Sequence, residues 1–209
     1  MKLFLSTIAL ILISGCSVVG QDNVDTAPYN LLESDKSLNI EVRNYESMVL
    51  VSTSMSRDGE DNAFRTLFNY IGGENEGSTE ISMTAPVIMD SDKTREKGTE
   101  ISMTAPVFMN ENADTPSMSF VMPKDFTLKS TPKPTNPNVR VSELKDYKVA
   151  TIQFSGTLSE SNVEENTKVL RDWIVNSKYT AKGEPVKAGY NGPLTLPWLR
   201  RNEILIEVE

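Results

Sequence analysis

Residues 79–89 read TEISMTAPVIM, and residues 99–109 read TEISMTAPVFM, so the chain contains one stretch twice. The two copies differ only in that Ile88 is replaced by Phe108. In each copy apolar side chains alternate with polar ones, which indicates a β-strand with one face on a core. The apolar positions are Ile81, Met83, Ala85, Val87 and Met89, and then Ile101, Met103, Ala105, Val107 and Met109.

A polar, charged segment over 90–98 separates the two copies. Two similar strands joined by a short polar loop predict an antiparallel hairpin, here with Met83 and Met103 buried. Pro86 and Pro106 cannot donate a hydrogen bond to a neighbouring strand, so each is expected at an edge or a bulge. A duplicated structural hairpin without chemistry of its own is the favoured interpretation of the repeat.

Residues 1–16 have the pattern of a targeting segment. Lys2 precedes an apolar run over 3–13, which has the length of a signal-peptide core and is shorter than the about 20 residues of a membrane span. The run ends in ISGC at Cys16, the only cysteine of the chain. This ending resembles a bacterial lipobox, in which the cysteine carries lipid. We therefore predict a lipoprotein signal peptide, with an ordinary secretory signal as the alternative.

The polar, mildly acidic residues 17–36 are predicted to be a tether between the lipid and a folded domain over 37–209. Ser17 follows the cysteine where an aspartate would favour retention in the inner membrane of enteric bacteria. By analogy with those lipoproteins, we expect this protein in the bacterial cell envelope, at the outer membrane rather than the inner one.

The folded domain is predicted to contain two halves with the same plan. The first has a strand near 40–45, a strand over 48–55 and a helix over 58–71, ended by two glycines. In the second half Val139, Val141 and Leu144 align with Ile40, Val42 and Tyr45 at a constant offset of 99 residues.

The second half continues with a strand over 147–154 and a helix that ends near 177, with Ser161 and Glu164 as a capping box. Further strands are predicted over 117–122, 185–190 and 203–208. The plan predicts an α+β fold: a pseudo-two-fold distorted β-barrel or curved antiparallel sheet flanked by two helices.

Several kinds of chemistry are disfavoured by composition. The 209 residues include no histidine, which removes the commonest metal ligand, general base and haem ligand. The formal net charge of −8 disfavours a nucleic-acid partner and gives no attraction to anionic lipid. The sequence also lacks a zinc-ligand cluster and a phosphate-binding glycine loop. We therefore expect binding rather than catalysis, and no metal site.

Methionine and phenylalanine offer the best candidate ligand contacts. The chain has nine methionines, mostly on predicted strands, and thioether side chains adapt to irregular cavities and flat aromatic ligands. Phe64 and Phe68 lie one turn apart on the helix over 58–71 and could form the floor of a groove between helix and sheet. Simple packing of the helix on the sheet is the alternative.

The paired MTAPV segments and the closing residues GYNGP and PWLRRNE, within 189–203, resemble the SOUL haem-binding protein family over about 37–209. The resemblance implies a distorted β-barrel with two helices, and haem or another tetrapyrrole in an apolar cleft beside the first helix. It also implies that Arg201 and Glu203 pair near the end of the last strand. Together with the apolar pattern, it places candidate ligand contacts at Phe64, Leu67, Phe68, Met55 and Arg65, with Arg57 or Arg65 near the haem propionates.

Some members of that family use an axial histidine, which this chain lacks. The expected haem affinity is therefore micromolar or poorer, with Met, Tyr or no protein ligand to the iron. A small-molecule hydrolase on the same fold would need a buried carboxylate, whereas the inward strand faces are predicted to be uniformly apolar. A ligand-free scaffold of the cell envelope is the third hypothesis. The ligand, the oligomeric state and the physiological role stay open.

Overall fold

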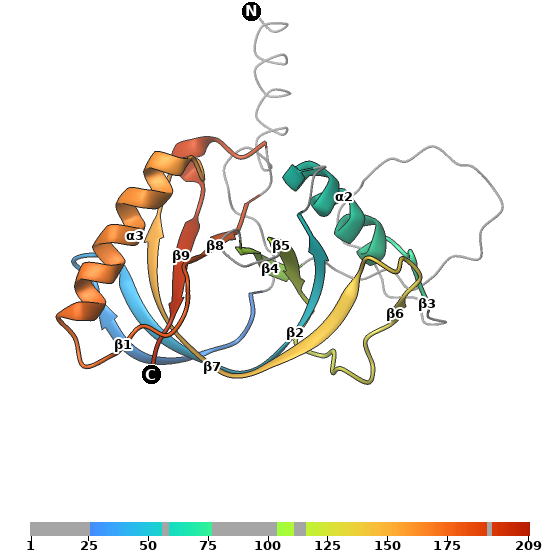
Figure 1. Cartoon of the computed structure of the whole chain (residues 1–209), viewed down its shortest axis with the longest axis horizontal. Helices are drawn as coiled ribbons and strands as arrows, with labels where there is room; N and C mark the ends of the chain where they lie inside the picture. The colour runs from blue at the N-terminus through green and yellow to red at the C-terminus, as the bar shows by residue number, and fades with distance from the viewer. Residues whose placement is uncertain (1–25, 56–58, 77–103, 111–115, 192–193) are drawn as a thin grey trace, which may run out of the picture.

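The computed structural model describes residues 26–55, 59–76, 104–110, 116–191 and 194–209 (Figure 1). The strands are β1 (Asn30–Asp35), β2 (Ile40–Ser54), β3 (Asn75–Glu76), β4 (Thr104–Asn110), β5 (Ser117–Val121), β6 (Lys133–Pro134), β7 (Arg140–Phe154), β8 (Val186–Gly189) and β9 (Asn202–Glu207). The helices are α2 (Gly59–Ile71), α3 (Glu160–Val175) and the 3-10 turn η1 (Pro197–Leu199).

Seven of these strands form one sheet in the order β1-β2-β5-β4-β8-β9-β7. Strand β7 also pairs with β2, which closes the sheet into an antiparallel barrel of six strands and leaves β1 as an extra strand on β2. Helices α2 and α3 lie over opposite ends of the long strands β2 and β7 (Figure 1). The predicted α+β barrel flanked by two helices is confirmed.

The two long strands carry the internal symmetry of the fold. Two successive strands were predicted at the start of each half. The structure has one continuous strand of 15 residues in their place, β2 in the first half and β7 in the second. Val42 pairs with Ala150, and Val51 pairs with Val141. A shift of 99 residues exchanges these two pairs, so the pairing itself has the predicted pseudo-two-fold symmetry.

Each long strand contributes to three separate cores. In β2, Ile40 and Val42 pack with α3, Tyr45 and Met48 lie in the central core of the barrel, and Val51 packs with α2. Alternate residues of a strand share one face, so this sequence requires the alternation to shift by one between Tyr45 and Met48. One continuous strand can therefore cover both helices and the barrel interior.

Helix α2 forms for the reason expected from sequence. Leu67, Tyr70 and Ile71 make a buried stripe at helical spacing against the sheet. The helix ends at Ile71, and Gly73 follows in the left-handed region with φ 111°, which glycine adopts without strain. The predicted range of 58–71 agrees with the observed helix to within one residue.

Helix α3 begins at Glu160, with Ser159 as the residue that precedes it. The predicted capping box of Ser161 and Glu164 is wrong, because Ser161 lies inside the first turn and the Ser159 side chain makes no capping hydrogen bond. Leu170 and Ile174 are buried as predicted, since they repeat at the spacing of one helical turn.

Strand β4 contains most of the second MTAPV copy, whereas the first copy and Met103 lie outside the described residues. Strand β4 pairs with β5 on one edge and with β8 on the other over residues 107–109. Over residues 107–109 both edges of β4 are occupied, so the predicted hairpin does not extend there, and its other strand lies outside the described part of the chain. The register shifts between Thr104 and Val107, so the bulge predicted at Pro106 is confirmed.

The predicted one-sided burial of this strand is also wrong. Phe108 and Met109 are neighbours in sequence and point to opposite faces, yet both are buried. Phe108 belongs to the central core and Met109 to the core under α2. The strand is covered on both faces, because a helix packs on the outside of the barrel at this point.

The N-terminal boundary differs from the expected one. Residues 30–35, within the range predicted as a polar tether, form β1 and pair with β2. Ala27 is buried, and its amide donates to the Ala105 carbonyl at 3.2 Å. Within the described part of the chain, no helix has both the length and the apolar character needed to cross a membrane. Cys16 lies outside that part.

Candidate functional site

An aromatic pair stands on one side of α2. The rings of Phe64 and Phe68 stack with centroids 6.0 Å apart, and Phe64 meets the buried Phe120 of β5 edge-on at 5.4 Å. Phe64 is nevertheless 38% exposed. A ring that is fixed on a buried aromatic partner and open to solvent on its other side offers a flat apolar contact for a ligand.

The other predicted contacts take different positions. Leu67 is fully buried in the core under α2, so it supports the helix and cannot meet a ligand while that core is packed. Arg65 is exposed and lies three residues before Phe68, a spacing that puts both on one side of a helix. Met55 is half-buried against the same core. Arg57 lies outside the described residues.

These residues meet the needs of a tetrapyrrole only in part. A tetrapyrrole presents a flat apolar ring and, in haem, two carboxylates. Phe64 and Phe68 fit the ring, and Arg65 supplies a permanent positive charge beside them. The chain offers no histidine to the iron. The set therefore fits a macrocycle that is held by its face and its carboxylates.

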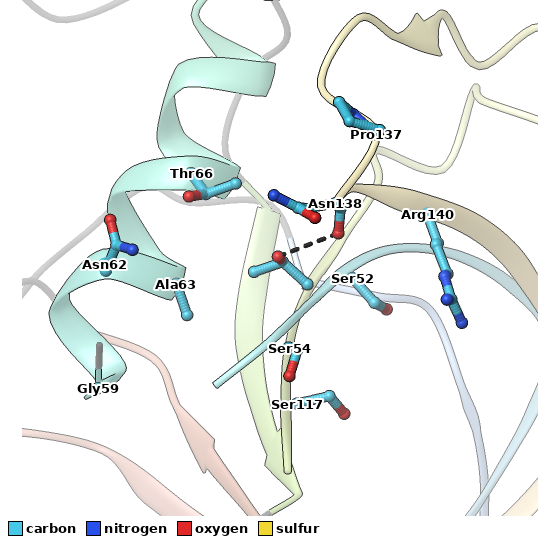
Figure 2. Close-up of a pocket in the computed structure, with 11 residues that line it drawn as sticks. Ser52, Ser54, Gly59, Asn62, Ala63, Thr66, Ser117, Pro137, Asn138 and Arg140 are labelled. Carbon is cyan, nitrogen blue, oxygen red and sulfur yellow. Dashed lines mark hydrogen bonds between the residues drawn. The ribbon is translucent and has the colours of Figure 1, made fainter. Parts of the chain in front are cut away.

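A cavity of about 480 Å³ lies on a different side of α2 (Figure 2). Helix α2 lines it with Gly59, Asn62, Ala63 and Thr66, while the ends of β2, β5 and β7 and the turn before β7 supply the rest. None of the five predicted contact residues lines it. The predicted cleft beside the first helix was apolar, whereas most side chains around this cavity carry a hydroxyl or an amide. It does not suit an apolar macrocycle.

A buried ionic cluster joins strand β2 to the last strand, β9. Arg43 of β2 is 2% exposed and Glu203 of β9 is fully buried. Nη1 and Nη2 of Arg43 donate to the two oxygens of Glu203 at 2.8 and 3.1 Å. Arg201 donates to the same carboxylate at 2.6 Å, and the Tyr190 hydroxyl donates at 2.7 Å. The pairing of Arg201 with Glu203 is confirmed.

The prediction of uniformly apolar inward faces is wrong at Arg43 and Glu203. Arg43 follows Val42, whose side chain faces α3, so alternation alone places Arg43 on the inward face. That position could have indicated a buried charge. Its partner could not be identified in the same way, because Glu203 lies 160 residues further along the chain.

The cluster holds Glu203 ionised. Burial by itself raises the pKa of Glu203, but hydrogen bonds and charge from Arg43 and Arg201 outweigh it and hold the pKa below the ordinary value. Burial, together with the Glu203 charge, raises the pKa of Tyr190, which therefore remains a neutral donor. A carboxylate with a lowered pKa and both oxygens bonded to cations is a poor general base.

The structure is a helix-flanked antiparallel β-barrel of the α+β class, with an exposed aromatic pair on α2 and a buried ionic cluster in the barrel. The family model described as SOUL heme-binding protein matches residues 24–207, and the chain belongs to this family. The resemblance inferred from the MTAPV and closing motifs is thus confirmed.

Two curated relatives are similar over most of their length. Heme-binding protein 1 of Xenopus laevis is 26% identical over 172 residues, which cover 78% of this chain and 80% of that protein. Heme-binding protein 1 of Mus musculus is 24% identical over 192 residues, which cover 87% of this chain and 92% of that protein.

A solved structure has a similar fold. The hydrolase from Listeria innocua in this crystal structure is 9% identical to this chain, with a TM-score of 0.52, and the match covers 82% of this chain and 92% of the hydrolase chain. This last likeness shows the fold alone.

Proposed function

We propose that this chain is a lipid-anchored protein of the bacterial cell envelope that binds haem or another tetrapyrrole weakly, without catalysis. The observation that carries the proposal is the stacked Phe64–Phe68 pair, which is open to solvent in a chain of the SOUL heme-binding family. The curated relatives share the name heme-binding protein 1, which supports the same ligand class.

Each residue of the aromatic side has a distinct role in this proposal. Phe64 and Phe68 contact the face of the macrocycle, and Arg65 pairs with a carboxylate at its edge. Met55 offers a polarisable thioether at the margin of the same core. When bound, haem supplies the redox-active iron, and the chain has no histidine to hold it.

The expected affinity follows from these contacts. Apolar burial contributes about 25 cal/mol per Å². Association and the ordering of side chains offset much of that gain. Because Phe64 and Phe68 are already packed, only their exposed faces are newly buried, and the dissociation constant is expected to be micromolar or poorer.

Catalysis by a buried carboxylate is the weaker alternative. Glu203 has the burial that such a base needs, but its oxygens accept hydrogen bonds from Arg43, Arg201 and Tyr190. Its lowered pKa opposes proton abstraction. The arrangement favours a structural role for the cluster and a binding role for the protein.

The envelope location is proposed from the sequence pattern at Cys16 and from Ser17 after it, which by analogy favours the outer membrane. The partners proposed are thus a flat apolar ligand and a lipid membrane, with no nucleic acid. The lipid on Cys16 would hold the domain at the membrane surface, since each buried methylene adds about 0.8 kcal/mol.

A titration of the full chain in detergent with haem, followed by the Soret band, tests the proposal. Phe64→Ala and Phe68→Ala should each weaken binding several-fold, while Trp198→Ala, which removes a 68% exposed aromatic ring from η1, should not. Iron-free protoporphyrin should bind within about threefold of haem, because no histidine ligates the iron. No saturable change with the wild type, or equal binding by all three variants, would contradict the proposal.

A further inference from the structure

Three large apolar side chains are exposed together between β8 and β9. Leu194 is 81% exposed, Trp198 is 68% exposed and Leu199 is 40% exposed. We refer to residues 194–199, which include η1, as the Trp198 loop. The described part of the chain exposes ten large apolar side chains, and three of them lie on these six residues, so they form a patch and are not scattered singly. In Figure 1 η1 is the red helical turn at the top, beside α3.

Hydrogen bonds hold the Trp198 loop in this shape. The Gly156 amide donates to the Pro197 carbonyl at 2.8 Å, which ties η1 to the segment before α3. The Arg200 Nε donates to the Thr195 carbonyl at 2.8 Å, and Thr195 itself is buried. A fixed turn therefore presents the apolar side chains to the outside of the molecule.

The composition of this stretch suits the surface of a lipid bilayer. Residues 185–202 contain no Asp or Glu, although the chain has 29 of them, and a carboxylate is costly to bring into a bilayer. Tryptophan is enriched where bilayers meet water, because its ring is apolar and its indole N–H is a hydrogen-bond donor. Leucine side chains beside it add apolar area that hydrocarbon can cover.

The segment that leads to the proposed lipid anchor enters the fold at the same end of the barrel. Thr26, the first described residue, bridges to Ala105 of β4, and β4 pairs with β8. Directly after β8, the Tyr190 amide donates to the Arg201 carbonyl at 3.3 Å. Arg201 follows the Trp198 loop by two residues. Neighbouring segments of one barrel end thus connect Thr26 with the base of the loop.

The connection from Cys16 to this end of the barrel is short. Strand β1 takes up residues 30–35, and only residues 17–25 separate Cys16 from Thr26. A chain of that length reaches at most about 36 Å, even when fully extended. A lipid on Cys16 would therefore keep the loop near the bilayer. Tethering raises the effective concentration of the membrane, so a patch that is too small to bind by itself can dock.

We propose that the Trp198 loop docks on the phospholipid bilayer that holds the Cys16 lipid, with Leu194 and Trp198 in the interfacial region. This inference rests on the lipid anchor proposed above. The contact is apolar and needs no anionic lipid, in keeping with the net charge of −8. Docking orients the domain, because the η1 end of the barrel then faces the membrane and the C-terminal end of α3 faces away from it.

Fluorescence quenching by brominated lipid tests the docking, because the chain has only two tryptophans. The full chain, purified from the membrane fraction, is placed in phosphatidylcholine vesicles with or without bromine near the headgroup end of the acyl chains, and flotation separates the bound protein. Trp173 is the internal reference: its Nε1 donates to Asp35 at 3.2 Å, and its ring stacks on Tyr179. Bromine should remove up to half of the wild-type emission and leave that of Trp198→Phe unchanged.

Two further variants separate a membrane contact from a general effect of charge. Leu194→Glu places a carboxylate in the patch and should reduce the quenching of Trp198 several-fold. Val175→Glu is the matched control, because Val175 is also 81% exposed but ends α3, about 24 Å along the helix from its first residue. Both variants should keep the wild-type melting temperature and haem affinity, which shows that the fold is intact.

Three results would overturn the docking while leaving the anchor in place. The first is a vesicle-bound wild type whose emission bromine does not change, as expected if the loop binds a protein instead of lipid. The second is quenching that persists in Trp198→Phe, and the third is an equal response of Leu194→Glu and Val175→Glu. If the wild type does not float with vesicles at all, the anchor is wrong and the docking falls with it, so the two failures are distinguishable.

Discussion

Replacing Arg43 by methionine tests whether the buried ionic cluster holds the barrel together. The guanidinium of Arg43 donates twice to Glu203 and once to Glu41, and it lies 4.5 Å from the centre of the Tyr29 ring. Arg43→Met removes all of these while keeping an unbranched apolar side chain in the same space. Glu203 is fully buried, so water cannot replace the lost donors.

The expected loss can be worked out from the remaining partners. Removing one member of a buried ion pair costs about 3–5 kcal/mol, because a charge is left uncompensated. Here Arg201 and Tyr190 still donate to the Glu203 carboxylate. The free energy of unfolding should therefore fall by about 3 kcal/mol, at the lower end of that range.

Urea unfolding of the full chain at pH 7, followed by circular dichroism, gives the free energy of unfolding. Arg43→Met combined with Glu203→Leu should be more stable than Arg43→Met alone, since the second change removes the buried charge that the first one stranded. A loss below about 1 kcal/mol in Arg43→Met would refute the reasoning. Losses in the two single variants that simply add in the double variant would refute it as well.

The same cluster predicts a pH dependence. The folded-state pKa of Glu203 lies below its ordinary value of 4.5, so its ionised form stabilises the native state above that pH. That contribution should be lost as the pH falls through the folded-state value. The Arg43→Met and Glu203→Leu double variant lacks the group, so its stability should change less between pH 5 and pH 3 than that of the wild type.

Two further changes test other assignments. Leu67→Ala should lower the free energy of unfolding by about 2–5 kcal/mol, because it opens a void in the core under α2. A denaturant midpoint close to that of the wild type would contradict the buried role of Leu67. Cys16→Ala should release the protein from the membrane fraction, because the lipid anchor is lost. If the variant stays in that fraction and its processing is unchanged, the lipobox prediction is wrong.

Local signals in the sequence were enough for the helices and for the overall plan. The apolar spacing from Ala63 to Ile71 and the following glycines predicted α2 to within one residue. Aligning Val139 and Val141 with Ile40 and Val42 predicted the pseudo-two-fold relation, which the pairing of β2 with β7 reproduces. One of these signals comes from residues close together in the sequence and the other from an internal repetition. A single sequence is therefore enough to show both.

Signals that depend on partners far along the chain could not be read in this way. The MTAPV repeat predicted a hairpin because neighbouring strands usually pair, but over residues 107–109 the two edges of β4 pair with β5 and β8. The alternation of apolar and polar residues up to Met109 predicted that β4 is buried on one face. The other face is buried because a helix packs on the outside of the barrel, which the alternation does not reveal. Arg43 and Glu203 meet only because the barrel closes between β2 and β7.

The position of α2 explains why one short helix can offer two different surfaces. Its buried stripe holds it on the sheet, so the residues on the two flanks of that stripe are exposed in different directions. One flank carries the Phe64–Phe68 pair, and the other carries Asn62 and Thr66 beside the cavity. Residues such as Phe64 and Thr66 differ in direction by about 200° on a helix, although they are only two positions apart. A substitution at Thr66 should therefore leave binding on the Phe64–Phe68 flank unchanged, provided that the stripe through Leu67 stays packed.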